Sequence, residues 1–296
     1  AKLVLQILIW GVFGVIYNIY SKEALDILPE PITLGLLQLT VGSVIVLITW
    51  SISPPLIAMH DARSSVYIAV CHLFGSIGTL LSMHFSSVGF THIVKAGEPI
   101  ATAFFSYTLG SRRYSAKTYS TLLLIVAGIG VASANEMRFS LAGLISSSLA
   151  AIFYPLRIVL SKKIFDSSTS AVTARSLFRL ITVLSTALAV PLLCFDANSV
   201  GGTTSMNSIL SITSNHKLLF LIIVSGASFH IYSEVMFIIL DNLSPLSLAV
   251  INSSRRIAII YVSVVVFGST MTARGFIGCA VAITGAFLFS LSNIYC

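Results

Sequence analysis

Long apolar stretches, separated by short polar or Pro/Gly-rich segments, recur along all 296 residues of the chain. A bilayer core about 30 Å thick is crossed by a helix of roughly 20 apolar residues, and the stretches are close to that length. The pattern therefore predicts an all-α integral membrane protein with ten transmembrane helices. These helices are expected near residues 3–20, 32–50, 66–86, 90–110, 119–134, 141–160, 172–195, 218–240, 246–267 and 274–294.

The end of the first half of this pattern resembles the end of the second half. Residues 107–131 and 265–288 share an apolar, Gly, polar, apolar, Gly order, with an offset of 158 residues between Gly110 and Gly268. This offset places the fourth and fifth predicted spans over the ninth and tenth. A unit of five helices crosses the membrane an odd number of times, so the second copy has the inverted orientation.

We therefore expect one membrane domain built from two inverted five-helix repeats, residues 1–137 and 138–296. Inverted repeats with a binding site near the middle of the membrane are typical of secondary transporters.

The composition agrees with a protein embedded in a lipid bilayer and excludes several other classes. Hydrophobic residues make up 56% of the chain and charged residues only 9%, and the mean hydropathy is +0.97. Lys and Arg outnumber Asp and Glu by 17 to 10, but no basic block of the kind that nucleic-acid binders use is present. The four cysteines have no paired spacing and no HExxH motif occurs. We therefore expect no nucleic-acid partner, no metal site and no cofactor.

A few ionisable residues fall well inside the predicted spans. A charge at that depth costs a few kcal/mol or more, and such residues usually mark an ion or substrate path. Two acidic residues cannot neutralise three basic ones, and the arginine fork and lysine ammonium both suit phosphate oxygens. We expect the three basic residues to bind an anion and the two acidic residues to orient buried basic groups. These five residues are Lys95, Glu98, Glu234, Arg255 and Arg256.

Other residues at a similar depth are candidates for structural, gating or ligand contacts. Lys95 and Glu98 are one helical turn apart and are expected to pair, and Pro99 is expected to disturb the helix beside them. Arg157 and Arg179 lie near predicted span ends and are expected to extend to the interface as structural residues. Residues that could contact the rest of a ligand or support the site are Ser76, Thr79, Tyr154, His230 and Tyr232.

Four segments resemble the plastid phosphate translocators of the drug/metabolite transporter superfamily. They are FTHIVKAGEP (90–99), FYPLRIVLSKKIF (153–165), SFHIYSEV (228–235) and NSSRR (252–256), and they occur in matching order over nearly the whole chain. The resemblance implies a ten-helix carrier of a plastid envelope, chloroplast or apicoplast-type. It further implies strict antiport of inorganic phosphate against phosphorylated three-carbon metabolites: triose phosphate, 3-phosphoglycerate or phosphoenolpyruvate.

By this resemblance, phosphate binds Lys95, Arg255 and Arg256, and the rest of the substrate meets Ser76, Thr79, Tyr154 and Tyr232. Two positions depart from the family pattern. Arg255 stands where relatives usually have lysine, which keeps the charge and changes its reach. Ser76 stands where triose-phosphate carriers have histidine, and a smaller side chain could admit phosphoenolpyruvate or a broader set.

Three other functions are compatible with a buried cationic site. A nucleotide-sugar or other organic-anion carrier of the same superfamily would also present basic residues at midplane. A membrane enzyme acting on phospho-substrates would need a nucleophile with a positioned base at the interface, and the sequence has no such cluster. An anion channel would need a continuous polar pore, whereas the repeat and its midplane basic residues favour alternating access. The sequence thus favours a transporter over an enzyme.

Overall fold

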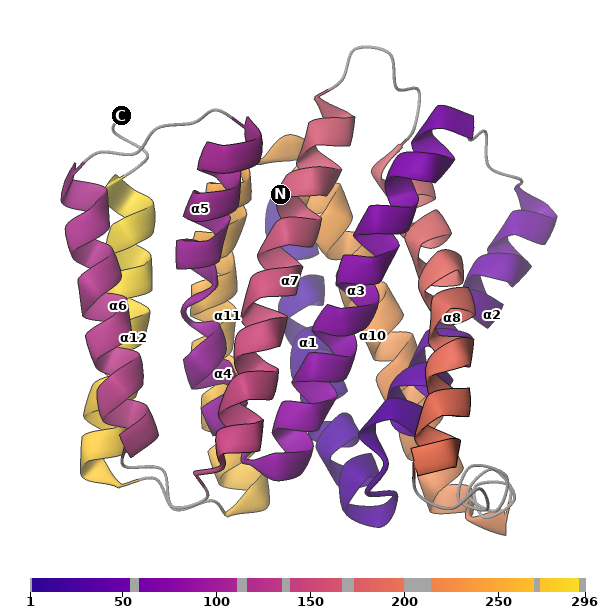
Figure 1. The fold of residues 1–296 in the computed structure, drawn as a ribbon, viewed down its shortest axis with the longest axis horizontal. Helices are drawn as coiled ribbons and strands as arrows, with labels where there is room; N and C mark the ends of the chain where they lie inside the picture. Colours follow the sequence, from indigo (N-terminus) through magenta and orange to yellow (C-terminus); the bar gives the residue numbers. More distant parts are fainter. Residues whose placement is uncertain are drawn as a thin grey trace.

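The computed structural model describes residues 2–53, 59–110, 116–134, 139–166, 173–199, 214–268 and 272–292. In these ranges all regular elements are α-helices, which stand side by side along one common direction (Figure 1). They are α1 (Lys2–Ile27), α2 (Pro31–Ile52), α3 (Met59–Phe85), α4 (Val88–Lys95), α5 (Glu98–Gly110), α6 (Ala116–Ala134), α7 (Leu141–Phe165), α8 (Ala174–Ser199), α10 (His216–Asn242), α11 (Pro245–Phe267) and α12 (Ala273–Ser292).

Much of the described chain is long and apolar enough to cross a membrane. Six helical segments meet both conditions: Lys2–Ile27, Pro31–Ile52, Arg63–Phe85, Leu141–Phe165, Ala174–Leu192 and His216–Asn242. Shorter apolar segments, Leu123–Ala132 and Ala273–Leu288, occupy α6 and α12. Large apolar side chains such as Leu123 and Val265 are exposed on the outside of the bundle, where lipid would cover them. The chain is therefore a multi-pass membrane protein whose regular elements, in the ranges given above, are all helical.

The helix expected over residues 90–110 is divided in two. α4 ends at Lys95 and α5 begins at Glu98, with a short turn that includes Gly97 between them. Pro99 is the second residue of α5, where a missing backbone N–H breaks no helical hydrogen bond. The break therefore precedes the proline, and the first turn of a new helix accommodates it.

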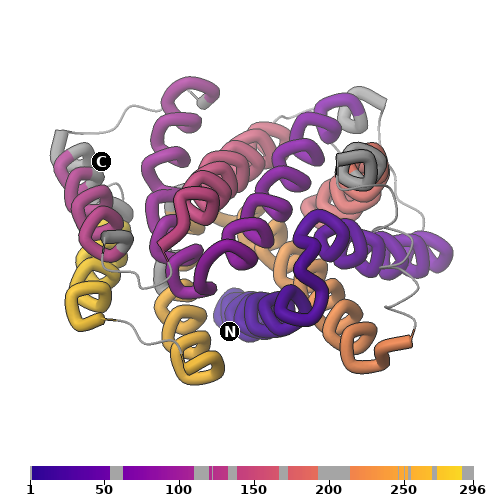
Figure 2. The backbone as a smooth tube through the Cα atoms, turned by 60° about the horizontal axis from the view of Figure 1, so that its bottom comes forward, coloured from indigo at the N-terminus to yellow at the C-terminus, as the bar shows by residue number. Residues whose placement is uncertain are grey.

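Several helices from different parts of the chain pack against one another in pairs. α3 packs along α7 and α1 along α10; α3 also contacts α8, as α10 contacts α2. α2 packs against α8, and α6 packs against α12 at one edge of the bundle (Figures 1 and 2). The expected boundary between residues 137 and 138 lies outside the described residues.

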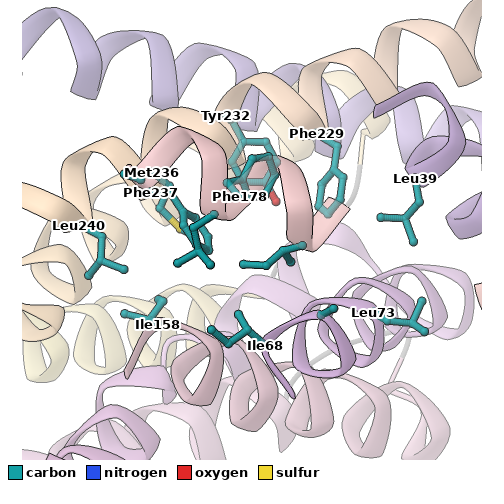
Figure 3. Close-up of a cluster of buried hydrophobic side chains, with 14 of the residues drawn as sticks. Leu39, Ile68, Leu73, Ile158, Phe178, Phe229, Tyr232, Met236, Phe237 and Leu240 are labelled. Atoms are coloured by element: carbon teal, nitrogen blue, oxygen red, sulfur yellow. The ribbon is translucent and has the colours of Figure 1, made fainter. Parts of the chain in front are cut away.

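Two apolar clusters fill much of the bundle. The larger joins aromatic side chains of α8 and α10 to aliphatic side chains of α2, α3 and α7, including Leu39, Ile68, Leu73, Ile158, Phe178, Phe229, Met236 and Phe237 (Figure 3). The second packs the C-terminal halves of α1, α3 and α11 against the N-terminal halves of α2, α4 and α10, with Leu25, Leu34, Leu80, Met83, Leu221 and Ile259. The second cluster closes the bundle at the end where α1 terminates.

Candidate functional site

Four basic side chains lie in the middle of the bundle. Lys95 on α4, Arg157 on α7 and Arg256 on α11 are 7%, 2% and 2% exposed, and Arg255 on α11 is partly buried. Lys95 interacts electrostatically with the three arginines and with the carboxylate of Glu98. One carboxylate beside one lysine and three arginines leaves basic groups in excess. A buried site with this excess is suited to an anion.

Lys95 is held by α3 and α7. Its Nζ donates a hydrogen bond to Thr79 Oγ1 at 3.0 Å and lies 4.5 Å from the centre of the Tyr154 ring. A Cβ at Gly75 would lie 3.1 Å from carbons of that ring, so the glycine makes room for the tyrosine. The expected pairing of Lys95 with Glu98 does not form, because the break between α4 and α5 separates the two residues and Glu98 pairs with α11.

Glu98 joins α5 to α11. Its Oε2 forms an ion pair with Arg256 and accepts a hydrogen bond of 2.9 Å from Asn252 Nδ2. Asn252 Oδ1 in turn accepts from Arg255 Nε and Nη2, at 3.2 and 2.8 Å. Asn252 was not singled out from the sequence, although its place one helical turn before Arg255 is a signal that could have identified it.

Arg255 lies between aromatic rings of α1 and α10. Its guanidinium carbon is 4.5 Å from the centre of the Trp10 ring and 5.1 Å from that of Tyr232, distances typical of cation–π contact. Gly14 on α1 permits this position, because a Cβ there would lie 2.5 Å from Arg255 Nη1. Nη1 is buried and has no hydrogen-bond partner among the described residues. A buried donor of this kind is costly unless a ligand or water satisfies it.

Arg157 does not extend to the interface, and that expectation was wrong. α7 continues to Phe165, past the predicted end at residue 160, so Arg157 lies inside the helix. Its Nη1 is 2.5 Å from His72 Nδ1, and its guanidinium carbon is 4.7 Å from the Tyr154 ring centre. Arg157 thus shares the Tyr154 ring with Lys95 and belongs to the same basic cluster.

Glu234 and His230 belong to a separate polar network that joins α8 to α10. Glu234 Oε1 is 3.1 Å from Arg179 Nη2 and 3.8 Å from Arg175 Nε. His230 Nε2 lies 3.3 Å from Glu234 Oε2. Glu234 therefore orients arginines of α8, and these contacts give it a structural place beside the site.

The remaining candidates divide according to their contacts. Ser76 Oγ donates to the carbonyl of Leu73 in its own helix, at 2.8 Å, one turn before Thr79. Pro99 lines a small cavity of about 10 Å³ with Trp10, Glu98, Asn252 and Arg256, which is room for about one water molecule. In this conformation the side chains of Lys95, Arg157 and Arg256 are buried.

The structure therefore brings most of the predicted site residues together: Lys95, Thr79 and Tyr154 on one side, and Glu98, Tyr232, Arg255 and Arg256 on the other. The sequence did not point to the aromatic support from Trp10. The Trp10–Arg255 contact joins helices that are distant in the sequence, and no local sequence pattern predicts it.

Comparisons with known proteins agree with a carrier of phosphorylated compounds. The sequence model of the Triose-phosphate Transporter family matches residues 1–290. Phosphoenolpyruvate/phosphate translocator 3, chloroplastic, of Oryza sativa subsp. japonica is 31% identical over 98% of this chain and 74% of that protein. Xylulose 5-phosphate/phosphate translocator, chloroplastic, of Arabidopsis thaliana is 30% identical over 95% of this chain and 69% of that protein.

A protein of known crystal structure shares the fold. Its TM-score is 0.60 at 14% identity, over 98% of this chain and 96% of that chain. The family match covers every residue of the basic cluster and nearly all of the helices around it. The chain therefore belongs to the Triose-phosphate Transporter family and is a membrane transporter of the phosphate translocator type, not an enzyme.

Proposed function

We propose that this protein exchanges inorganic phosphate for phosphorylated three-carbon metabolites by strict antiport. The observation that carries the proposal is the convergence of Lys95, Arg255 and Arg256 on one buried site with an excess of positive charge. The two relatives described above are named for different organic phosphates, yet both are named for phosphate. Phosphate is therefore the part of the substrate that a shared basic cluster would recognise.

The charge of the cluster supports coupled exchange. With the site empty, reorientation carries uncompensated positive charge through a closed, poorly solvated state. A phosphate dianion offsets this charge and supplies acceptors for donors such as Arg255 Nη1, which has no partner among the described residues. The loaded carrier therefore changes orientation readily and the empty carrier does not.

The corresponding helix pairs support an architecture of ten spans in two inverted five-helix repeats. If α1 to α6 and α7 to α12 are equivalent, with α4 and α5 forming one interrupted span, then α3–α7 and α1–α10 are equivalent contacts. The contacts α3–α8 and α10–α2 are equivalent in the same way. Lys95 comes from the first half and Arg255 and Arg256 from the second. Rocking of one half against the other would expose the site alternately to each side.

The surroundings of the cluster favour a small substrate. Aromatic rings of Trp10, Tyr154 and Tyr232 pack directly on the basic groups, and the described cavity beside Glu98 and Arg256 has a volume of about 10 Å³. A three-carbon phosphate requires less opening of this site than a nucleotide sugar does. Ser76, with its hydroxyl turned to its own helix, leaves more space on α3 than a histidine would and suits phosphoenolpyruvate beside triose phosphates.

We assign the protein to a plastid envelope, chloroplast or apicoplast-type, because the relatives are named as chloroplastic. Imaging of the full-length protein, tagged at its C-terminus, against an envelope marker tests this location. A signal from another membrane system would remove the assignment and leave the transport proposal standing.

Reconstitution into liposomes tests the transport proposal. Vesicles are loaded with phosphate, triose phosphate, 3-phosphoglycerate, phosphoenolpyruvate, glucose 6-phosphate or a nucleotide sugar, and uptake of labelled phosphate is followed. We expect rapid uptake against phosphate and the three-carbon compounds and slow uptake against the larger ones. Equal or faster uptake against glucose 6-phosphate would contradict the three-carbon assignment, and uptake only against the nucleotide sugar would contradict phosphate antiport.

A further inference from the structure

A groove of about 420 Å³ runs between α1 and α11 on the outside of the bundle. Its walls are apolar side chains of both helices, and Arg255 is the single charged residue among the described residues that line it. Gly11 lies in this wall, and a Cβ added there would meet no atom within 4 Å. The neighbouring Leu8 and Val12 are 60% and 57% exposed, so this face of α1 is turned towards lipid.

Trp10 separates the groove from the inner cavity. Its side chain lines the groove on one side and, on the other, the cavity that Glu98, Asn252 and Arg256 also line. The guanidinium of Arg255 stacks on the same ring. An anion bound to Arg255 therefore lies at the junction of a charged interior and an apolar groove.

We propose that the basic site also binds monophosphates that carry an unbranched alkyl chain, with the phosphate on Arg255 and the chain in the α1–α11 groove. This inference rests on the proposed function, because it uses the same phosphate site. The groove offers an apolar chain hydrocarbon contacts, and Arg255, which lines it, has a buried Nη1 that lacks an acceptor among the described residues. A hydrophilic sugar chain would gain no hydrophobic binding energy from the apolar walls of the groove.

An ordinary bilayer lipid cannot place its phosphate on Arg255 and its acyl chain in the groove at the same time. Arg255 is the eleventh of the 23 residues of α11, close to the middle of the helix. The phosphate of a bilayer lipid stays at the interface, about 15 Å from the centre of a 30 Å hydrocarbon core. Its acyl chain could enter the groove, but its phosphate would not reach Arg255. A short-chain alkyl phosphate entering from the aqueous side satisfies both contacts.

The test is inhibition of phosphate exchange by methyl, butyl and hexyl phosphate in phosphate-loaded liposomes. These short chains remain largely in water, so inhibition reports binding to the protein. We expect the inhibition constant to fall by up to about fourfold per added methylene while the groove is being filled. Gly11→Leu places a side chain in the groove and should abolish this trend, while exchange of phosphate itself continues.

Gly130→Leu on α6 is the matched control, because Gly130 also has no neighbour within 4 Å of an added Cβ and lies away from the groove. It should keep the chain-length trend. Equal inhibition by methyl and hexyl phosphate in the wild type, or an unchanged trend in Gly11→Leu, would overturn the inference and leave phosphate antiport intact. No phosphate exchange by the wild type would overturn the proposed function and this inference with it.

Discussion

The guanidinium of Arg256, in the middle of α11, forms an ion pair with the carboxylate of Glu98 at the first residue of α5. Both side chains are buried, and Asn252 donates a second hydrogen bond to the same carboxylate oxygen. Glu98 therefore compensates one of four basic charges when no anion is present. A substrate phosphate that binds Arg256 must compete with this carboxylate or share the arginine with it.

Glu98→Gln should make the site bind phosphate more tightly and exchange it more slowly. The amide keeps the size of the side chain and removes its charge, so a bound anion meets one more uncompensated cation. An additional interaction of about 1 kcal/mol would lower the KM for phosphate about fivefold. Because tighter ground-state binding also slows release, the maximal exchange rate should fall. Glu98→Asp, which retains the charge, should change KM less, and a raised KM in Glu98→Gln would contradict this role.

Thr79→Val should weaken phosphate binding through Lys95. The substitution keeps the shape of the side chain and removes the hydroxyl that accepts from Lys95 Nζ at 3.0 Å. A hydrogen bond to a charged group contributes about 1.5 kcal/mol, so the KM for phosphate should rise about tenfold. Thr79→Ser restores the hydroxyl and should stay near the wild-type value. Identical kinetics for the valine and serine variants would show that the threonine does not position the lysine.

Gly14→Ala should displace the Arg255 side chain, although the added methyl group itself does not contact the substrate. The added methyl group would lie 2.5 Å from Arg255 Nη1 and 3.4 Å from its Cδ, so the guanidinium must shift from its position. A strained side chain costs about 1 kcal/mol, which predicts a two- to tenfold rise in the KM for phosphate. Gly11→Ala, one turn earlier on α1 and free of neighbours within 4 Å, is the control and should behave as the wild type. Equal kinetics in the two alanine variants would refute this contact.

Gly128→Ala should destabilise the α6–α12 pair. A Cβ at Gly128 would overlap the backbone of Ala282, and a Cβ at Gly278 would overlap that of Ala132, so neither helix can yield without separating. Overpacking of this kind costs about 1–3 kcal/mol. The melting temperature in detergent should fall, whereas Gly130→Ala, in open space on the same helix, should leave it unchanged. A normal melting temperature for Gly128→Ala would show that the helices separate without cost.

The apolar pattern was sufficient to predict a helical membrane protein, because crossing a bilayer requires long runs of apolar residues whatever their neighbours are, and the number of ten spans stays a prediction. The unbalanced charge inside the predicted spans correctly indicated that Lys95, Arg255 and Arg256 lie together inside the bundle, and their role in binding phosphate stays a prediction. The interruption of this helix was predicted only in part: Pro99 indicated a disturbed helix, but the break lies before the proline, because proline fits the first turn of a new helix. The placement of Arg157 was wrong because α7 extends through polar residues to Phe165, beyond the length that hydropathy alone assigns.

Contacts between distant helices could not be derived from the sequence. The Trp10–Arg255 stack joins α1 to α11, and neither residue carries a local signal of the other. Glu98 is a second example: its position predicted an ion pair with Lys95, one turn away, but in the structure it pairs with Arg256. Tertiary packing decides such pairings, whereas the sequence decides only which charges need a partner.

The measurement that tests the central claim most directly is the initial rate of labelled phosphate uptake into phosphate-loaded and empty liposomes, for the wild type and Arg256→Gln. Rapid uptake by the wild type into loaded vesicles only, lost in the variant by about a hundredfold or more, is the predicted result, because removing a buried charge contact costs about 3 kcal/mol. Comparable uptake into empty vesicles would contradict strict antiport. Undiminished exchange by Arg256→Gln would contradict the buried basic cluster as the phosphate site.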